Sequence, residues 1–315
     1  MRHALLILVL AAGATAKDEV YRPRAGALAI ATARIELPRG EGEKPLRVRV
    51  THPTAKGKYP VIVYSHGMYG SGDAYRPLVD AWAKTGYVFF QPTHPDSRSL
   101  GVKARAEAVK AWRVRPQEVA LILDSLDAIV KRVPALKGKL DRARIGVGGH
   151  SFGAHTSQLV TGVRTRIQRR LALRDKRVKC ALLISPQGRG GLFGDDAWKS
   201  WTAPALVITG SNDGDPFGDP KKTPQWRLDS YALSPPADKY LLWIDGAHHS
   251  FGGISGARRR GSGPKNEKHV ALVRDAGLAF FDAYVKGSAG AKAWLRRNTK
   301  PRAPATKPIP KPTVK

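Results

Sequence analysis

The sequence predicts an α/β fold in which helices cover both faces of a mostly parallel, doubly wound sheet. Short runs of continuously apolar residues alternate along the chain with segments of helical periodicity. Continuous rather than alternating apolarity indicates strands that are buried on both faces, as in a parallel sheet. Strands that alternate with helices in this way are typical of doubly wound sheets. The apolar runs are residues 61–64, 87–90, 145–147, 181–184, 205–208 and 240–244.

An antiparallel hairpin is predicted before the first of these runs. Residues 27–37 and 45–51 form its strands, and the Gly- and charge-rich turn 39–42 joins them. The clearest helix is predicted over 116–133, where apolar residues recur at three- and four-residue steps. Further helices are expected near 75–84 and 268–285.

Both ends of the chain differ in composition from the predicted domain of residues 17–297. Residues 1–16 combine a basic start, a short apolar run and an A-x-A site, which predicts a signal peptide cut after Ala16. The apolar run is too short for a transmembrane anchor, so we expect a secreted or periplasmic protein. Residues 298–315 are rich in Pro and basic side chains, which predicts a disordered tail.

The composition is strongly basic. The chain has 54 Lys and Arg against 25 Asp and Glu, a formal net charge of +29. Such an excess favours anionic surfaces, polymers or substrates as partners, and Arg258 is a candidate to attract them at the rim of the site. Nucleic acid is not an expected partner, because no basic motif interleaved with aromatic residues is present. The single cysteine, Cys180, is predicted to be a buried small hydrophobe. No spacing of Cys and His indicates zinc, and we expect no metal or cofactor.

The motif Gly149-His150-Ser151-Phe152-Gly153 is the strongest sign of function. It lies between an apolar strand and a run of small residues, which is the pattern of a strand, a sharp turn and a helix with a serine at the apex. Such a turn exposes the hydroxyl and directs the N-terminus of the helix toward it. Ser151 is therefore predicted to be a catalytic nucleophile.

An acid and a base follow in the chain order that this architecture requires. Asp213 comes after the apolar run 205–208 and is the predicted acid, with Asp215 as the alternative. The base is expected in the loop after the last strand, where His248 and His249 are adjacent. The residues alone leave the choice between these histidines open.

These motifs resemble the bacterial α/β-hydrolases grouped with dienelactone hydrolases and platelet-activating-factor acetylhydrolases. The resemblance covers roughly residues 45–285 in collinear order. The segments that carry it are 61–67, 94–97, 115–116, 149–154, 210–213 and 246–253. It implies an α/β-hydrolase fold with an eight-stranded type of sheet, and it implies ester hydrolysis.

The resemblance also implies roles for individual residues. It favours His249 as the base and places the oxyanion donors at the backbone N–H groups of Met68 and Phe152. Dienelactone hydrolases use a cysteine nucleophile, and the serine here argues against that particular activity. A possible aromatic rim of the substrate site is predicted from residues that could equally pack in the core. They are Tyr69, Phe152, Trp201 and Phe251.

The sequence therefore predicts a secreted or periplasmic serine hydrolase that cleaves carboxylic esters through an acyl-enzyme. The substrate is a small-molecule or polymeric ester. One alternative keeps the chemistry and changes the substrate, giving a lipase or a polyester hydrolase of the cutinase or PET-hydrolase type. An alternative from another class is a catalytically idle hydrolase fold that binds polyanions.

Overall fold

A single sheet runs through the molecule. The computed structural model describes residues 20–167, 173–256 and 263–301, and the strands named here lie in those ranges. The sheet order is β1-β2-β4-β3-β5-β6-β7-β8-β9. The strands are β1 (Ile30–Leu37), β2 (Leu46–Pro53), β3 (Tyr59–Ser65), β4 (Val88–Pro92), β5 (Leu140–His150), β6 (Val178–Ile184), β7 (Ala205–Asn212), β8 (Lys239–His248) and β9 (Lys300–Pro301).

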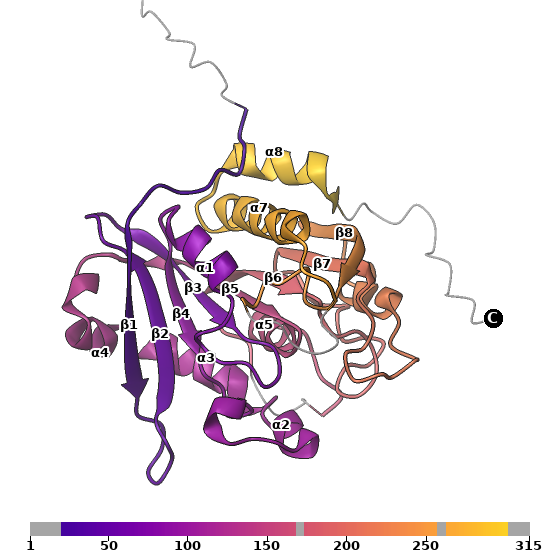
Figure 1. The fold of residues 1–315 in the computed structure, drawn as a ribbon, viewed down its shortest axis with the longest axis horizontal. Helices are drawn as coiled ribbons and strands as arrows, with labels where there is room; N and C mark the ends of the chain where they lie inside the picture. Colours follow the sequence, from indigo (N-terminus) through magenta and orange to yellow (C-terminus); the bar gives the residue numbers. More distant parts are fainter. Residues whose placement is uncertain (1–19, 168–172, 257–262, 302–315) are drawn as a thin grey trace, which may run out of the picture.

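The predicted α/β-hydrolase fold is confirmed. Strands β4, β3, β5, β6, β7 and β8 pair in parallel, and β1 and β2 form the predicted antiparallel hairpin at one edge. Figure 1 shows this hairpin at the opposite side of the sheet from β8. Each apolar run of the sequence lies in or directly at the start of one of the parallel strands, because a strand covered on both faces buries most of its side chains.

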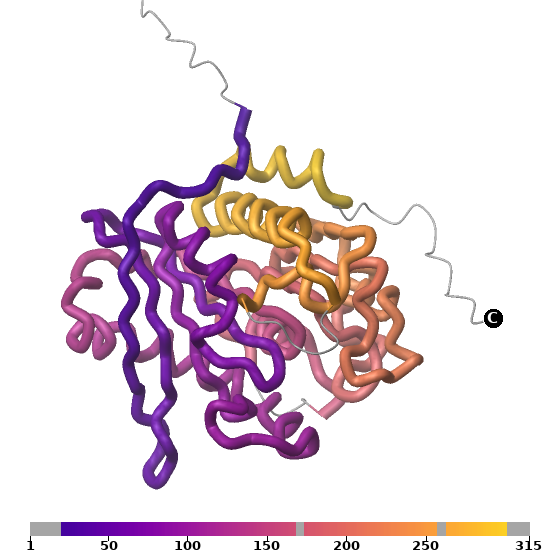
Figure 2. Tube along the Cα trace, viewed as in Figure 1, coloured from indigo at the N-terminus to yellow at the C-terminus, as the bar shows by residue number. Residues whose placement is uncertain are grey.

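Helices cover both faces of the sheet. They are α1 (Arg76–Ala83), α2 (Arg105–Lys110), α3 (Val114–Asp124), α4 (Leu126–Arg132), α5 (Phe152–Thr161), α6 (Asp229–Ala232), α7 (Glu267–Tyr284) and α8 (Ala289–Asn298), with short 3₁₀ turns at Arg98–Leu100, Pro134–Leu136 and Pro224–Leu228. Helices α1 and α7 contribute to one hydrophobic cluster, while α3 and α5 contribute to the other. The tube in Figure 2 shows α7 and α8 together above the sheet.

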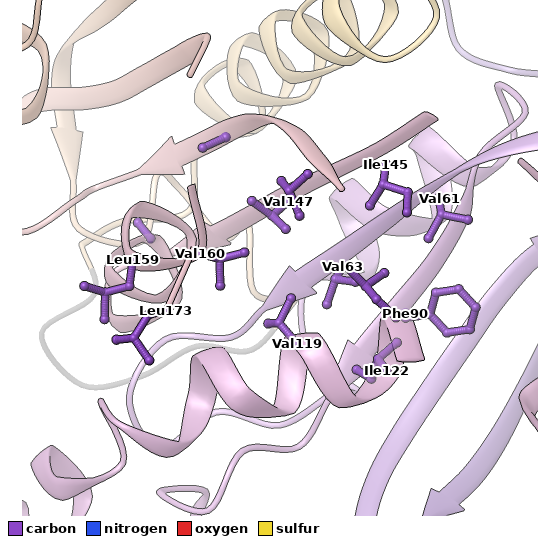
Figure 3. Close-up of a cluster of buried hydrophobic side chains, with 14 of the residues drawn as sticks. Val61, Val63, Phe90, Val119, Ile122, Ile145, Val147, Leu159, Val160 and Leu173 are labelled. Atoms are coloured by element: carbon purple, nitrogen blue, oxygen red, sulfur yellow. The ribbon is translucent and has the colours of Figure 1, made fainter. Parts of the chain in front are cut away.

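The core under α3 and α5 holds the strand that carries Ser151. Val61 and Val63 of β3 and Val147 of β5 are buried with Val119 of α3 and Leu159 of α5 (Figure 3). Burial of a side chain of this size contributes about 1.5–3 kcal/mol. This packing fixes the end of β5, and with it the turn that follows.

The helix predicted over 116–133 is divided in the structure. Helix α3 ends at Asp124 and α4 begins at Leu126, because Ser125 leaves the helical conformation with ψ 8°. The apolar stripe nevertheless continues, since Ile122, Leu126 and Ile129 are all buried. The apolar periodicity thus predicted which face of the helix is buried. It did not show the break between α3 and α4, because the break depends on the backbone angles of one residue.

The ends of the described chain add one antiparallel pair. Helix α8 runs to Asn298, and β9 then pairs with β8 through Tyr240 opposite Pro301. The described structure thus reaches past residue 297, while the predicted signal peptide and residues 302–315 lie outside it. Within the described ranges, no helix combines the length and the apolar character needed to cross a membrane.

Candidate active site

Ser151 occupies a strained turn between β5 and α5. Its backbone has φ 54° and ψ −118°, a conformation that costs a non-glycine residue about 1–3 kcal/mol. Two glycines make the turn possible. A Cβ on Gly153 would lie 1.9 Å from the carbonyl oxygen of Ser65, and one on Gly149 would lie 2.4 Å from the backbone of Gly153. The small residues of the motif are thus required by close backbone approach around the serine.

An aspartate and a histidine meet at the ends of the neighbouring strands. His249 follows β8, and its Nδ1 lies 2.8 Å from Oδ1 of Asp213, which follows β7. A carboxylate only accepts hydrogen bonds, so Nδ1 carries the proton and Nε2 is left to act as a base. The Asp213 side chain is fully buried, whereas 15% of the His249 side chain is exposed.

Other buried groups orient this pair. The hydroxyl of Thr209 donates to Oδ2 of Asp213 at 2.9 Å, and that of Ser185 donates to Oδ1 at the same distance. Arg227 lies beside the same carboxylate, with Nε 3.0 Å from Oδ1. We call Ser185, Asp213, Arg227 and His249 the acid–base cluster.

The pKa of His249 is lowered from its ordinary value of 6.5. Burial of the ring is the largest cause, and the positive charge of Arg227 adds to it, while Asp213 acts in the opposite direction. The imidazole is therefore neutral at neutral pH, which is the form that accepts a proton.

His150, the residue before Ser151, connects the turn to the histidine loop. Its Nε2 donates to the carbonyl oxygen of His249 at 2.8 Å, and the two rings lie 4.7 Å apart between centroids. Its Nδ1 accepts from the hydroxyl of Tyr75 at 2.8 Å. The loop that carries His249 is thereby held against the end of β5, which leads into Ser151.

Asp215 and His248, the alternatives considered from the sequence, make other contacts. The Asp215 carboxylate accepts the backbone N–H of Asp219 at 3.1 Å. His248 closes β8 and has its Nε2 3.3 Å from the amide of Asn212. Asp213 and His249 are the residues that the fold brings into contact.

The loop after β3 rests on a second buried network. Arg115 forms a two-pronged ion pair with Asp96 and donates to the carbonyl oxygen of His66 at 2.7 Å. Asp96 in turn accepts the backbone N–H of Tyr69 at 3.3 Å. These bonds hold both sides of Met68, one of the two predicted oxyanion donors.

His94 and Glu118 extend this network below the loop. His94 donates its backbone N–H to Nε2 of His66 at 3.0 Å, and its ring contacts Glu118 at 2.5 Å. Burial raises the pKa of Glu118 to about 8, and burial lowers that of His94. We call His66, His94, Asp96, Arg115 and Glu118 the oxyanion-loop cluster.

A pocket of about 260 Å³ opens at Ser151. Met68 and Phe152, whose N–H groups are the predicted oxyanion donors, line it together with the serine. Phe152 is the first residue of α5, and the N–H groups of a first helical turn have no acceptor within the helix. The positive end of the helix dipole also points to this position.

The predicted aromatic rim needs correction. Trp201 and Phe251 are buried in the two hydrophobic clusters, where their large apolar surfaces are removed from water, so they do not form a rim. Tyr69 lines a separate hollow with Asp73 and Ser255. Arg258 lies outside the described residues. Of the predicted aromatic residues, Phe152 does line the pocket at Ser151, together with Phe193, Phe217 and Trp226, which were not predicted.

Sequence reasoning missed Ser185 and Arg227. Ser185 directly follows the apolar run of β6, a position at the same sheet edge as the other site residues, and that signal was available. Arg227 lies in a 3₁₀ turn without a motif, and only the fold shows that it is buried against Asp213. Cys180, in contrast, is buried and free as predicted.

Two comparisons with known proteins found likenesses to this chain. The family model described as chlorophyllase matches residues 17–167, a range that contains Met68 and Ser151. The platelet-activating factor acetylhydrolase of Cavia porcellus is 24% identical over 275 residues, which cover 72% of this chain. The match spans 58% of the length of that relative.

The chain thus has the α/β-hydrolase fold, and these likenesses support a relationship to the α/β-hydrolases. Its relationship is to the esterase-like members of that superfamily, as the predicted resemblance implied.

Proposed function

We propose that the protein is a serine hydrolase that cleaves carboxylic esters through an acyl-enzyme. The observation that carries the proposal is the Asp213–His249 pair at 2.8 Å, held by His150 against the strained turn of Ser151. Such a turn persists only where the surrounding packing enforces it, and strained residues of this kind cluster at functional sites.

In the proposed reaction, Nε2 of His249 takes the proton of the Ser151 hydroxyl as its oxygen attacks the ester carbonyl. The bond to the alcohol then breaks, and His249 returns the proton to the departing oxygen. Water attacks the acyl-enzyme with His249 again acting as base, which releases the acid and restores Ser151. Asp213 stabilises the imidazolium formed in each half-reaction.

The backbone N–H groups of Met68 and Phe152 would stabilise the oxyanion in both steps. One such donor typically contributes about 10²–10³ in turnover. The pocket favours a short acyl group, because its volume of about 260 Å³ lies below the roughly 300–1,000 Å³ of typical ligand sites.

The decisive experiment compares Ser151→Ala with the wild type on p-nitrophenyl acetate. The variant should lose turnover by roughly 10⁴- to 10⁶-fold while its circular dichroism stays unchanged. A folded Ser151→Ala protein with wild-type turnover would disprove the mechanism. A fluorophosphonate that labels the wild type but not the variant would separate this proposal from an idle hydrolase fold.

We also propose that the enzyme acts outside the cytoplasm, on the strength of its first 16 residues. N-terminal sequencing of the exported protein should then begin at Lys17. The net charge of +29 supports an anionic partner or surface, and added salt should then weaken its binding to anionic polymers.

A further inference from the structure

Arg227 is a fully buried guanidinium with an unusual set of acceptors. Its Nε donates to the carbonyl oxygen of Asp213 at 2.6 Å, and Nη2 donates to that of Gly214 at 2.7 Å. Its Nη1 donates to the carbonyl oxygens of Ser185 at 3.1 Å and Pro186 at 3.2 Å. One side chain thus joins the loop after β6 to the loop after β7.

The same guanidinium reaches both members of the proposed acid–base pair. Its Nε lies 3.0 Å from Oδ1 of Asp213, and Nη2 lies 3.3 Å from Nδ1 of His249. Since Nδ1 already directs its proton to Asp213, the guanidinium and the ring face each other as two donors. The contact therefore opposes a positive charge on the imidazole.

We propose, on the basis of the proposed esterase function, that Arg227 is a positioning residue that fixes Asp213 and whose charge, together with burial of the ring, favours the neutral form of His249. Asp213 alone would favour the imidazolium, because an unneutralised carboxylate attracts a neighbouring positive charge. Arg227 offsets part of that attraction. The enzyme keeps an oriented base that still releases its proton readily to the departing alcohol.

The other groups that face His249 do not replace this effect. Asp215 is a carboxylate and favours the charged ring. His150 contacts the carbonyl oxygen and ring of His249, and the hydroxyl of Ser185, 2.9 Å from Nδ1 of His249, carries no charge. Among the described groups in contact with His249, Arg227 is the only cationic side chain.

The first test is the pH profile of kcat/KM for p-nitrophenyl acetate in Arg227→Gln, measured between about pH 4 and 9. Loss of the charge should move the acid limb, the part of the profile where kcat/KM rises with pH, to higher pH. The largest loss of activity should therefore fall at acidic pH. Arg227→Lys keeps the charge and should move the limb less. If Arg227→Gln folds and the acid limb of its pH profile coincides with that of the wild type, the proposal is overturned.

Arg115→Gln is the matched control. It removes an equally buried guanidinium that is paired with Asp96, and the structure shows no contact between Arg115 and His249. This variant should lower kcat through the loop of Met68 but leave the acid limb in place. A limb that moved equally in both variants would show that any buried arginine has this effect and would overturn the proposal.

A double variant keeps the test decisive if Arg227→Gln does not fold. Asp213→Asn with Arg227→Gln removes both charges of the ion pair, so that no unpaired charge remains buried. The titration of His249, followed by the NMR signal of its ring proton without substrate, should lie at higher pH than in Asp213→Asn alone. Identical titrations would overturn the role of Arg227 and would not bear on ester hydrolysis, which Ser151→Ala tests separately.

Discussion

Two buried charged clusters lie on either side of Ser151, and they differ in what they leave accessible. The acid–base cluster contains a histidine whose side chain is 15% exposed and whose Nε2 is not engaged by Asp213. In the oxyanion-loop cluster, His94, Asp96 and Arg115 are all fully buried. Their hydrogen bonds end on one another, on backbone atoms, or on the buried side chains of Ser65 and Glu118.

The difference teaches that buried charge near Ser151 can serve two separate uses. In the proposed mechanism a proton moves through one cluster, so one titratable ring keeps access to the pocket. In the other, paired charges fix the backbone that carries Met68, and no group needs to titrate. Mutations in the first cluster should therefore change the pH dependence and turnover, whereas mutations in the second should mainly change stability and kcat.

The largest effect is expected for Asp213→Asn. Loss of the carboxylate leaves His249 without its acceptor, and turnover on p-nitrophenyl acetate should fall about 10⁴-fold. Asp215→Asn, the alternative from the sequence, should lose less than about tenfold, because Asp215 does not contact the ring. Equal losses in the two variants would contradict the assignment of Asp213.

Arg115→Gln should produce the largest loss of stability. Breaking a buried ion pair by removing one partner costs about 3–5 kcal/mol, because Asp96 remains buried and unpaired. Urea unfolding measures the loss. A change below about 1 kcal/mol would contradict the view that this ion pair supports the loop of Met68.

The wild-type pH profile probes the acid–base cluster directly. The pKa of His249 is lowered from 6.5, chiefly by burial, so the acid limb of kcat/KM should have its midpoint below pH 6.5. Activity should rise with pH through this midpoint, because the base must be neutral. A limb centred above pH 6.5 would mean that Asp213 outweighs burial and Arg227.

The smallest expected effect is that of Glu118→Gln in the oxyanion-loop cluster. Burial raises the pKa of Glu118 from 4.5 to about 8, so the folded state holds this proton more tightly than the unfolded state. The resulting stabilisation is complete below pH 4.5 and is lost as pH rises through about 8. Glutamine cannot ionise but also loses the ion pair with Arg39, so the unfolding free energy of the variant, measured by urea unfolding, should gain on that of the wild type as pH rises from about 7 to about 9.

Much of the fold could be predicted because it depends on local patterns. The apolar runs of β3 to β8 and the hairpin of β1 and β2 are visible as residue types in sequence. The division at Ser125 was not visible, because apolar spacing is the same on both sides of the break. Trp201 and Phe251 were misplaced for a related reason, since an aromatic residue looks the same in a core and at a rim.

The sequence by itself determined the strand–turn–helix around Ser151, because Gly149 and Gly153 leave room for backbone contacts that a Cβ would prevent. It also determined that an aspartate and a histidine follow at the ends of later strands. Only the tertiary structure decided that Asp213 and His249 meet and that Arg227 lies between two loops beside them. Such contacts join residues 14 to 42 positions apart in the chain, and they arise from the order of strands in the sheet, which no local pattern encodes.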